Sequence, residues 1–148
     1  MMTKLGVLVA LSALSLGCDA LGNCPAESDP VTMDTGTTDV DALVYASGPI
    51  DGPRTHFPAK TFVHFIHDLG YMPNDVNTKV SFTELGSDSS ENTGNQGRIK
   101  CVDDHEIVIK NDTCEEDFWI QVSASAALKW HARCSCTERD DNGKCPGE

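Results

Sequence analysis

Basic side chains are scarce in this 148-residue sequence, which has 11 Lys and Arg against 23 Asp and Glu and a formal net charge of −12. Nucleic-acid binding depends on the neutralisation of phosphates by Lys and Arg, so we expect no nucleic-acid partner. The same acidic surface repels anionic lipid headgroups. Attachment to a membrane would therefore have to depend on something other than a basic patch.

Catalytic motifs are also missing from the sequence. It contains no Gly-x-Ser-x-Gly elbow, no His-Glu-x-x-His pair and no phosphate-binding glycine loop. The neighbouring carboxylates Glu115 and Glu116 have no identifiable partner acid, and a thiol nucleophile would need a cysteine outside a disulfide. We therefore predict that the protein is not an enzyme, and we assign no catalytic residue.

No apolar run is long enough to cross a bilayer, which requires about 20 residues. The longest run, residues 5–16, follows Lys4 and is interrupted only by Gly6, Ser12 and Ser15. A charged start, a short apolar segment and an abrupt polar continuation at Asp19 are typical of a cleavable signal peptide. We predict such a leader over residues 1–17.

The leader ends in Leu14-Ser15-Leu16-Gly17-Cys18 and resembles the lipobox of bacterial lipoproteins. The resemblance implies cleavage before Cys18 and attachment of acyl chains, such as palmitate, to its thiol. Each buried methylene contributes about 0.8 kcal/mol, so two or more chains would anchor the protein to a membrane of the cell envelope. The domain would then lie on the periplasmic or extracellular side. The alternative is a plain secretory leader that is cut after Ala20.

Six cysteines remain after the predicted lipidation site: Cys24, Cys101, Cys114, Cys134, Cys136 and Cys145. In an exported protein such a set indicates disulfide bonds. Cys134 and Cys136 are too close in sequence for an unstrained bond with each other. We expect Cys101 to pair with Cys114 across a local loop, and the tail cysteines to pair with each other or with Cys24.

Short apolar or alternating segments separated by turn residues predict an all-β fold. The clearest alternation lies at residues 76–83 and 118–124, and further strands are predicted at 42–47, 61–67, 99–102, 107–110 and 128–132. Two sheets must pack face to face to hide their apolar faces. We predict a small antiparallel β-sandwich of about seven strands with a disulfide-clamped C-terminal tail.

The predicted organisation is a signal peptide (1–17), a lipid-anchored polar tether (18–41), the β-sandwich (42–134) and a cysteine-containing tail (135–148). The predicted core consists of large apolar residues of the strands: Tyr45, Phe62, Ile66, Val80, Phe82, Ile99, Ile107, Ile109, Phe118, Ile120, Val122 and Trp130.

No metal site is predicted. His64 and His67 are three residues apart, which places them on opposite faces of a strand. His131 and the tail cysteines could bind zinc, but disulfides explain those cysteines better in an oxidising compartment. Asp103, Asp104 and the run 111–117 supply oxygens of the kind that calcium prefers, yet such runs are usually only solvated. We predict no cofactor, with calcium as the alternative.

Residues 62–82 contain His67-x-Leu69-Gly70-x-x-Pro73-x-x-Val76 between two predicted strands. This stretch resembles a strand connection of small β-sandwich domains of the H-type lectin and phage tail-fibre kind. The resemblance implies the sandwich fold and a carbohydrate-binding role as an alternative, but it carries over no sugar-contacting residue. Tyr71 and Trp119 are aromatic side chains that could stack on a sugar ring.

The leading hypothesis from the sequence is a non-catalytic cell-envelope lipoprotein that displays an interaction or structural domain. Its partners would be the membrane, through Cys18, and an envelope protein or a glycan. A carbohydrate-binding module is the first alternative, and a hydrolase or metal-binding protein is the second.

Overall fold

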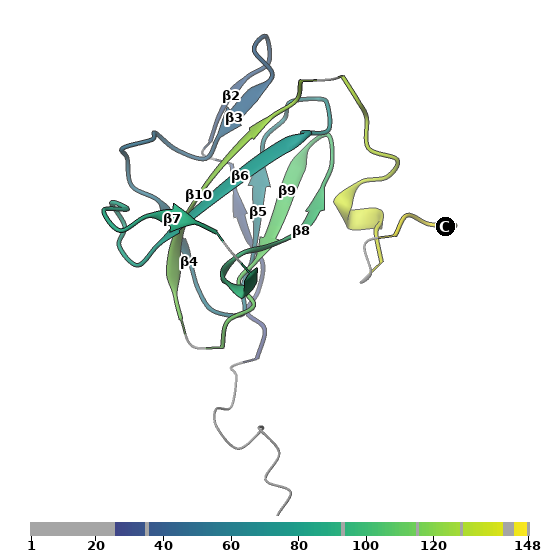
Figure 1. Ribbon diagram of the computed structural model, residues 1–148. Coiled ribbons are helices and arrows are strands. Elements are labelled where there is room, and N and C mark those ends of the chain that lie inside the picture. Colours follow the sequence, from purple (N-terminus) through teal and green to yellow (C-terminus); the bar gives the residue numbers. More distant parts are fainter. Residues whose placement is uncertain are drawn as a thin grey trace, which may run out of the picture.

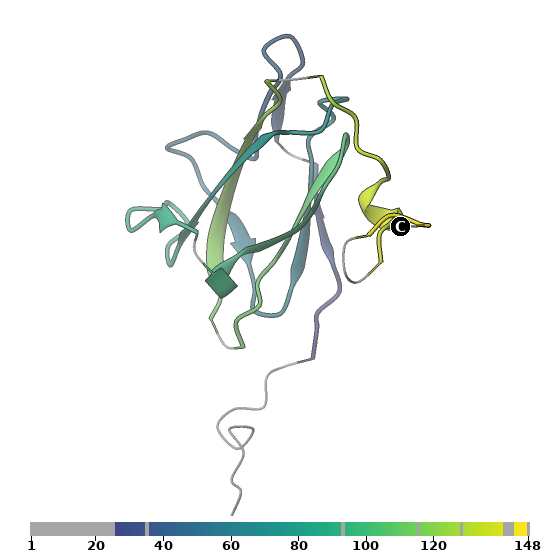
Figure 2. The same cartoon turned by 45° about the vertical axis from the view of Figure 1, so that its right-hand side comes forward.

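The computed structural model describes residues 26–34, 36–92, 94–114, 116–127, 129–140 and 144–147. They form two β-sheets that face each other, with only short 3₁₀ turns besides the strands (Figures 1 and 2). The predicted all-β sandwich is therefore confirmed. Within this part of the chain, no helix is long and apolar enough to span a membrane.

The four-stranded sheet has the order β1 (Val31–Met33), β5 (Phe62–Ile66), β9 (Glu106–Lys110) and β8 (Arg98–Val102). β1 runs parallel to β5, whereas β5, β9 and β8 are antiparallel neighbours. β8 and β9 form a hairpin and correspond to the strands predicted at 99–102 and 107–110. A bulge between Ile99 and Cys101 interrupts the register of β8, which is an edge strand.

The six-stranded sheet is built around β10 (Phe118–Ser125), its longest strand. One edge of β10 pairs with β6 (Asp75–Ser81), which also pairs with β7 (Ser90–Glu91). The other edge pairs with β4 (Thr55–Phe57) near its start and with β3 (Val44–Ala46) near its end. β2 (Thr37–Asp39) pairs with β3 and completes the sheet.

The core lies between the two sheets and receives alternate residues from each. It contains Tyr45, Phe57, Val63, Phe65, Leu69, Val80, Ile107, Ile109, Phe118, Ile120, Val122 and Ala124. Burial of one large apolar side chain contributes about 1.5–3 kcal/mol. β10 shows the pattern most clearly, because Phe118, Ile120 and Val122 are buried while the residues between them are not.

Several predicted core residues lie elsewhere. In β5 the inward residues are Val63 and Phe65, so the prediction for Phe62 and Ile66 was one residue out of phase and named the opposite face. Ile99 on the edge strand is 41% exposed, and Phe82, just beyond the end of β6, is 66% exposed.

The last predicted strand, at 128–132, is also wrong. Residues 129–132 are not in a strand, and Trp130 is 63% exposed, although the prediction placed it in the core. Leu128 lies outside the described residues. The carbonyl of Trp130 instead accepts a hydrogen bond from the backbone N–H of Met72.

The predicted tether is too long at its C-terminal end. Residues 31–33 form β1 and residues 37–39 form β2, so both segments belong to the sandwich rather than to a free linker. These strands are short and lack a clear apolar alternation, and their pairing comes from backbone hydrogen bonds to neighbours. The predicted leader, the lipidation site Cys18 and Cys24 lie outside the described residues.

Disulfides join Cys101 to Cys136 and Cys134 to Cys145, and Cys114 is disulfide-bonded as well. The prediction that the tail cysteines pair with each other is correct for Cys134 and Cys145, whereas the Cys101–Cys114 pairing is wrong. Cys101 lies opposite Val108 in the hairpin, while Cys114 follows the far end of β9. The sulfur of Cys101 is bonded to that of Cys136, which leaves it unavailable to Cys114.

Candidate functional site

An open groove of about 590 Å³ runs along the outer face of the four-stranded sheet, and the C-terminal tail forms one of its walls. Figure 2 shows the tail beside this sheet, on the side away from the six-stranded sheet. We call this groove the tail groove. Phe62 and Val108 form an apolar floor, and the other lining residues are Glu27, Pro30, His64, Lys100, Cys101, Glu106, Lys110, Cys136, Thr137, Arg139 and Asp140.

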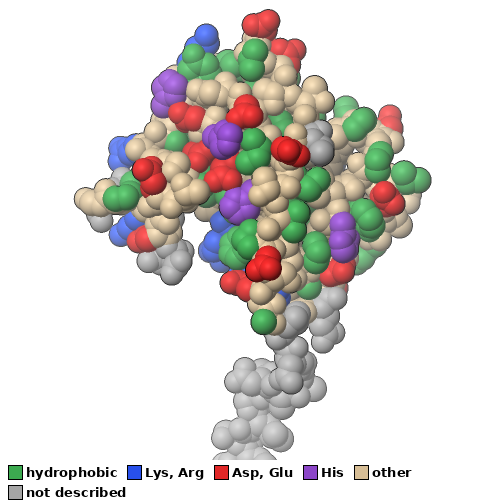
Figure 3. Space-filling view, turned by 180° about the vertical axis from the view of Figure 1, so that it is seen from behind, with side chains coloured by type: hydrophobic (Ala, Val, Ile, Leu, Met, Phe, Trp, Pro, Cys, Tyr) green, Lys and Arg blue, Asp and Glu red, His purple; other side chains and the backbone are tan. Residues whose placement is uncertain are grey.

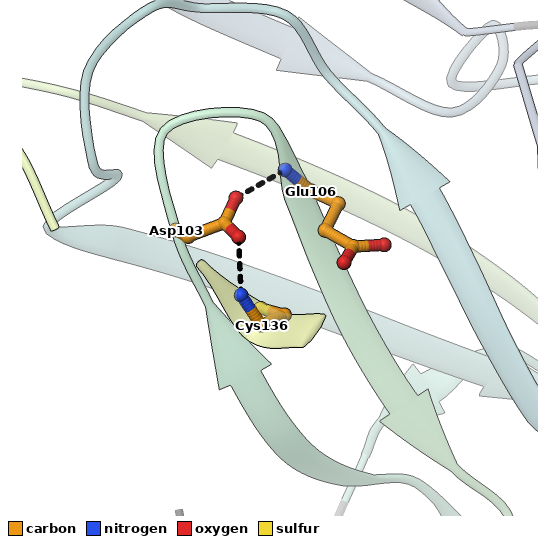
Figure 4. A group of neighbouring side chains, drawn as sticks. All are labelled: Asp103, Glu106 and Cys136. Atoms are coloured by element: carbon orange, nitrogen blue, oxygen red, sulfur yellow. Dashed lines mark hydrogen bonds between the residues drawn. The ribbon is translucent and has the colours of Figure 1, made fainter. Parts of the chain in front are cut away.

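The carboxylate of Asp103 fastens the tail to the β8–β9 hairpin (Figure 4). Its Oδ1 accepts backbone N–H bonds from His105 and Glu106, each at 2.7 Å, and its Oδ2 accepts the N–H of Cys136 at 2.6 Å. Burial of this carboxyl would raise its pKa, but these three hydrogen bonds outweigh burial and hold the pKa below the ordinary value. Asp103 is therefore a structural anion.

Four further contacts hold the tail in place. Asp104 accepts the N–H of Ala132 at 2.6 Å and pairs with His131 at 2.7 Å. The guanidinium of Arg139 donates to the carbonyl of Val102 at 3.3 Å. The Cys101–Cys136 disulfide adds a covalent link between β8 and the tail. The wall of the groove is thus fixed to the sheet at several points.

Asp103, Glu106 and Cys136 place three possible metal-ligand atoms within 4.8 Å of one another (Figure 4). The sulfur of Cys136 is bonded to Cys101, however, and both oxygens of Asp103 already accept backbone N–H groups. A metal ion needs a thiolate or a free carboxylate oxygen. The disulfide-bonded chain therefore does not offer three metal ligands at this cluster.

Histidine side chains lie beside acidic ones over the face seen in Figure 3. His64 and Glu106 form the pair inside the tail groove, with Nδ1 of His64 at 2.7 Å from Oε2 of Glu106. Glu106 is buried at 6% exposure, so most of its carboxylate is enclosed by protein. His105 pairs with Asp68 on the exposed surface of the same hairpin.

His67 has a structural role and does not share a site with His64, as their spacing predicted. Its ring is fully buried at the end of β5, with Nδ1 accepting the backbone N–H of Leu69 at 3.1 Å. Nε2 lies 3.1 Å from the carbonyl of Asp103, to which it donates. Because both nitrogens are used in this way, the ring must be neutral and protonated at Nε2.

Acidification is expected to destabilise the domain through His67. Burial lowers the pKa of His67 below the ordinary value, so the folded state favours the neutral ring. The stability contributed by this histidine is complete above the ordinary pKa of about 6.5 and decreases as the pH falls below it, because the unfolded chain then binds the extra proton. Urea unfolding at about pH 7.5 and about pH 5 should show this decrease.

A His67→Asn variant provides the control for this prediction. Its stability should be lower at neutral pH and should change less between the two pH values. An unchanged pH dependence in the variant would mean that His67 is not the source of the effect.

Several of the acidic residues considered for calcium have protein partners. Asp104 binds the tail, and Asp117 accepts the N–H of Ala59 at 2.9 Å and lies 3.4 Å from His56. Among the described residues, no group of three metal-ligand side chains gathers around residues 111–117. The cysteines considered for zinc, Cys134, Cys136 and Cys145, are all in disulfides.

Tyr71 and Trp119, the aromatic candidates for sugar stacking, do not share a site. Trp119 lies near the start of β10 with its ring 5.1 Å from that of His56. Tyr71 precedes Asn74, which bonds to the end of β10, and its ring is 5.0 Å from that of His131. Trp119 and Tyr71 therefore lie near opposite ends of β10, a strand of eight residues with a rise of about 3.3 Å per residue.

A second groove, of about 470 Å³, crosses the outer face of the six-stranded sheet. Its polar lining includes Asn77, Lys79, Glu91, Gln121 and Ser123. Gln121 donates to the carbonyls of Gly48 and Pro49, which fixes the loop beside the groove. We call it the sheet groove.

Comparison of the chain with protein-family models, curated proteins and solved structures gives no match. The structure defines a class, a disulfide-bonded all-β domain, and disulfides of this kind indicate an extracytoplasmic location. Function must therefore be argued from the grooves and from the leader.

Proposed function

We propose that this protein is a lipid-anchored, non-catalytic component of the bacterial cell envelope whose β-sandwich binds a partner through the tail groove. The observation that carries the proposal is the fastening of the tail by a disulfide and a buried carboxylate. A preformed groove loses little conformational entropy when it binds, which favours affinity.

The lining of the tail groove supports a partner that presents acidic or carbonyl oxygens beside an apolar group. Lys110 is already bound to Glu27 and Asp112, and these contacts, led by the hydrogen bond to Glu27, raise its pKa. Lys100 forms no ion pair among the described residues, and Nε of Arg139 has no hydrogen-bond partner there. Lys100 is therefore the cation that a partner can reach above the Phe62 and Val108 floor, whereas the Nε of Arg139 is enclosed by protein.

Lipid attachment is supported by the leader and by the acidic composition of the chain, which disfavours binding to anionic lipid headgroups. The leader contains Lys4 and no acidic residue, so its removal changes the formal charge of the chain by one, from −12 to −13. Mass spectrometry of the mature protein should find a diacylglyceryl-modified N-terminal Cys18. A Cys18→Ser variant should move from the detergent phase to the aqueous phase, while Asp19→Asn should remain in detergent.

An unmodified mature chain that begins at Leu21 would contradict the anchor. The groove is tested separately with a photo-crosslinking residue at Lys100 and, as the control, at the exposed Glu84 in the turn after β6. A crosslinked envelope component should form only from position 100. The same product from position 84, or none from position 100, would remove the tail groove from the proposal.

Carbohydrate binding on the outer face of the six-stranded sheet, at the sheet groove and the neighbouring Trp119, is the second candidate. Trp119, Gln121 and Ser123 alternate along β10, so they share its outer face, and Lys79 and Asn77 are their neighbours on β6. An aromatic ring beside amide and hydroxyl groups suits a sugar ring and its hydroxyls. A glycan array should then give a signal that Trp119→Ala removes and Trp130→Ala, at an exposed tail position, does not.

A further inference from the structure

We propose that reduction of the Cys101–Cys136 disulfide turns the tail groove into a Zn²⁺ site. The ligands are the thiolates of Cys101 and Cys136 and the carboxylate of Glu106, with His64 as a positioning residue. The zinc site lies in the same tail groove, but this proposal does not depend on the partner-binding role proposed above.

The ligand atoms are already close together in the disulfide-bonded chain. The sulfur of Cys136 and a carboxylate oxygen of Glu106 lie within 4.8 Å of each other, and the sulfur of Cys101 is bonded to that of Cys136. All three residues line the tail groove, which gives an ion access from solvent. Thiolate and carboxylate are usual zinc ligands, so only small shifts would bring them around one ion.

The tail stays on the hairpin without the disulfide, which keeps the two sulfurs together after reduction. The N–H of Cys136 binds Asp103 at 2.6 Å, and this bond does not involve the sulfur. Asp104 holds Ala132 upstream, and Arg139 binds Val102 downstream. Asp103 itself is not a ligand, because its oxygens accept three backbone N–H groups (Figure 4).

His64 orients the carboxylate ligand. Its Nδ1 lies 2.7 Å from Oε2 of Glu106, so one oxygen of Glu106 is held by the imidazole and the other can turn toward the sulfurs. A hydrogen bond to a ligating group commonly tunes metal affinity in this way. Three protein ligands leave the fourth tetrahedral position open to water from the groove.

The reduction step is a thiol–disulfide exchange with a dithiol reductant. The dithiol gives up two electrons and two protons as it closes to its own disulfide, and Cys101 and Cys136 each become a thiol. Zn²⁺ then binds both sulfurs as thiolates and releases two protons to solvent. The oxidised chain has no thiolate at this position and should not bind the ion.

The test uses the full folded domain with Cys134→Ser and Cys145→Ser, which removes the other tail disulfide. A phosphine reductant avoids added thiols: it gives two electrons to the disulfide and becomes the phosphine oxide, taking its oxygen atom from water while the two protons go to the sulfurs. Co²⁺ serves as the spectroscopic probe and Zn²⁺ competes for it. The reduced protein should show a thiolate-to-cobalt charge-transfer band that Zn²⁺ abolishes, and the oxidised protein should show none.

Three variants in this background distinguish a metal site formed by the folded chain from nonspecific binding of the metal to free thiols. Cys101→Ser with Cys136→Ser should abolish the band, which also controls for thiols released at Cys114. Glu106→Gln and His64→Ala should each lower Zn²⁺ affinity by roughly 10–100-fold. An unfolded reduced chain would be insensitive to Glu106 and His64. No band in the reduced protein, a band that survives loss of both cysteines, or unchanged affinity in both Glu106→Gln and His64→Ala would each overturn the proposal.

Discussion

The Asp103→Ala variant is expected to lose about 3 kcal/mol of unfolding free energy, because a buried donor left without a partner costs about 1–3 kcal/mol and two partly buried donors lose bonds to a charged acceptor. The donors are the backbone N–H groups of His105, Glu106 and Cys136. Domains are typically stable by only about 5–15 kcal/mol, so the variant would approach the threshold of unfolding. Urea denaturation at neutral pH measures the loss.

Asp104→Ala is the matched control for this prediction. Asp104 is the next residue and also binds the tail, but its side chain is 32% exposed and it accepts only one backbone N–H, that of Ala132. Its loss should be about 1 kcal/mol. Equal losses in the two variants would contradict the special role of Asp103.

The pH dependence provides a second check on Asp103. Since its pKa is lowered in the folded state, its contribution is complete above the ordinary value of about 3.9 and disappears as the pH falls below that value. The difference in unfolding free energy between wild type and Asp103→Ala should therefore become smaller in acid. A difference that widens would mean that the folded state favours the protonated carboxyl.

Two of the strands that were predicted correctly have one wet face. Residues 76–81 and 118–124 alternate between apolar and polar side chains, and both form paired strands of the six-stranded sheet. Such a pattern fixes both the existence of the strand and the face that is buried. In β5, by contrast, Phe62, Val63, Phe65 and Ile66 are all apolar, so the sequence does not select a phase.

The strands that were missed are short and depend on their neighbours. β1, β2 and β4 have three residues each and β7 has two, too few for any period to show. β1 exists because its backbone pairs in parallel with β5, and β4 because it pairs with the start of β10. Contacts between distant segments decide such strands, and one sequence does not contain them.

The tail groove could not be predicted for a similar reason. The six cysteines could be recognised as a disulfide framework, but their pairing depends on which residues the fold brings together. One local signal was present: Asp103 stands two and three residues before the N–H groups that it accepts, as Asp commonly does in turns. Its bond to Cys136, 33 residues later, required the structure.

Asn111→Asp is expected to destabilise the domain by about 3–5 kcal/mol, because it buries an unpaired charge. Asn111 is fully buried, and its Nδ2 donates to the carbonyls of Phe57 and Glu116, each at 3.0 Å. In the variant a carboxylate oxygen replaces this nitrogen and faces the two carbonyls. The other half of the side chain, Oδ1, would still accept the N–H and hydroxyl of Thr113.

Acid should partly rescue Asn111→Asp, in contrast to its effect on the wild type. A buried carboxyl that faces carbonyl oxygens has a raised pKa in the folded state, so the folded variant binds a proton that the unfolded chain releases above about pH 3.9. Its deficit relative to wild type should be largest at neutral pH and should shrink as the pH falls through the raised pKa. Urea unfolding at about pH 7 and about pH 5 tests this.

Asn74→Asp makes the same chemical change at an exposed position. Oδ1 of Asn74 accepts the N–H of Ala127, a role that a carboxylate retains, so stability should change by less than about 0.5 kcal/mol. Two results would contradict the prediction: equal losses of unfolding free energy in Asn74→Asp and Asn111→Asp, or a loss in Asn111→Asp that grows in acid. Either would mean that the amide of Asn111 does not donate to the carbonyls of Phe57 and Glu116. The outcome thus separates the burial of a charge from the mere addition of one to an already acidic protein.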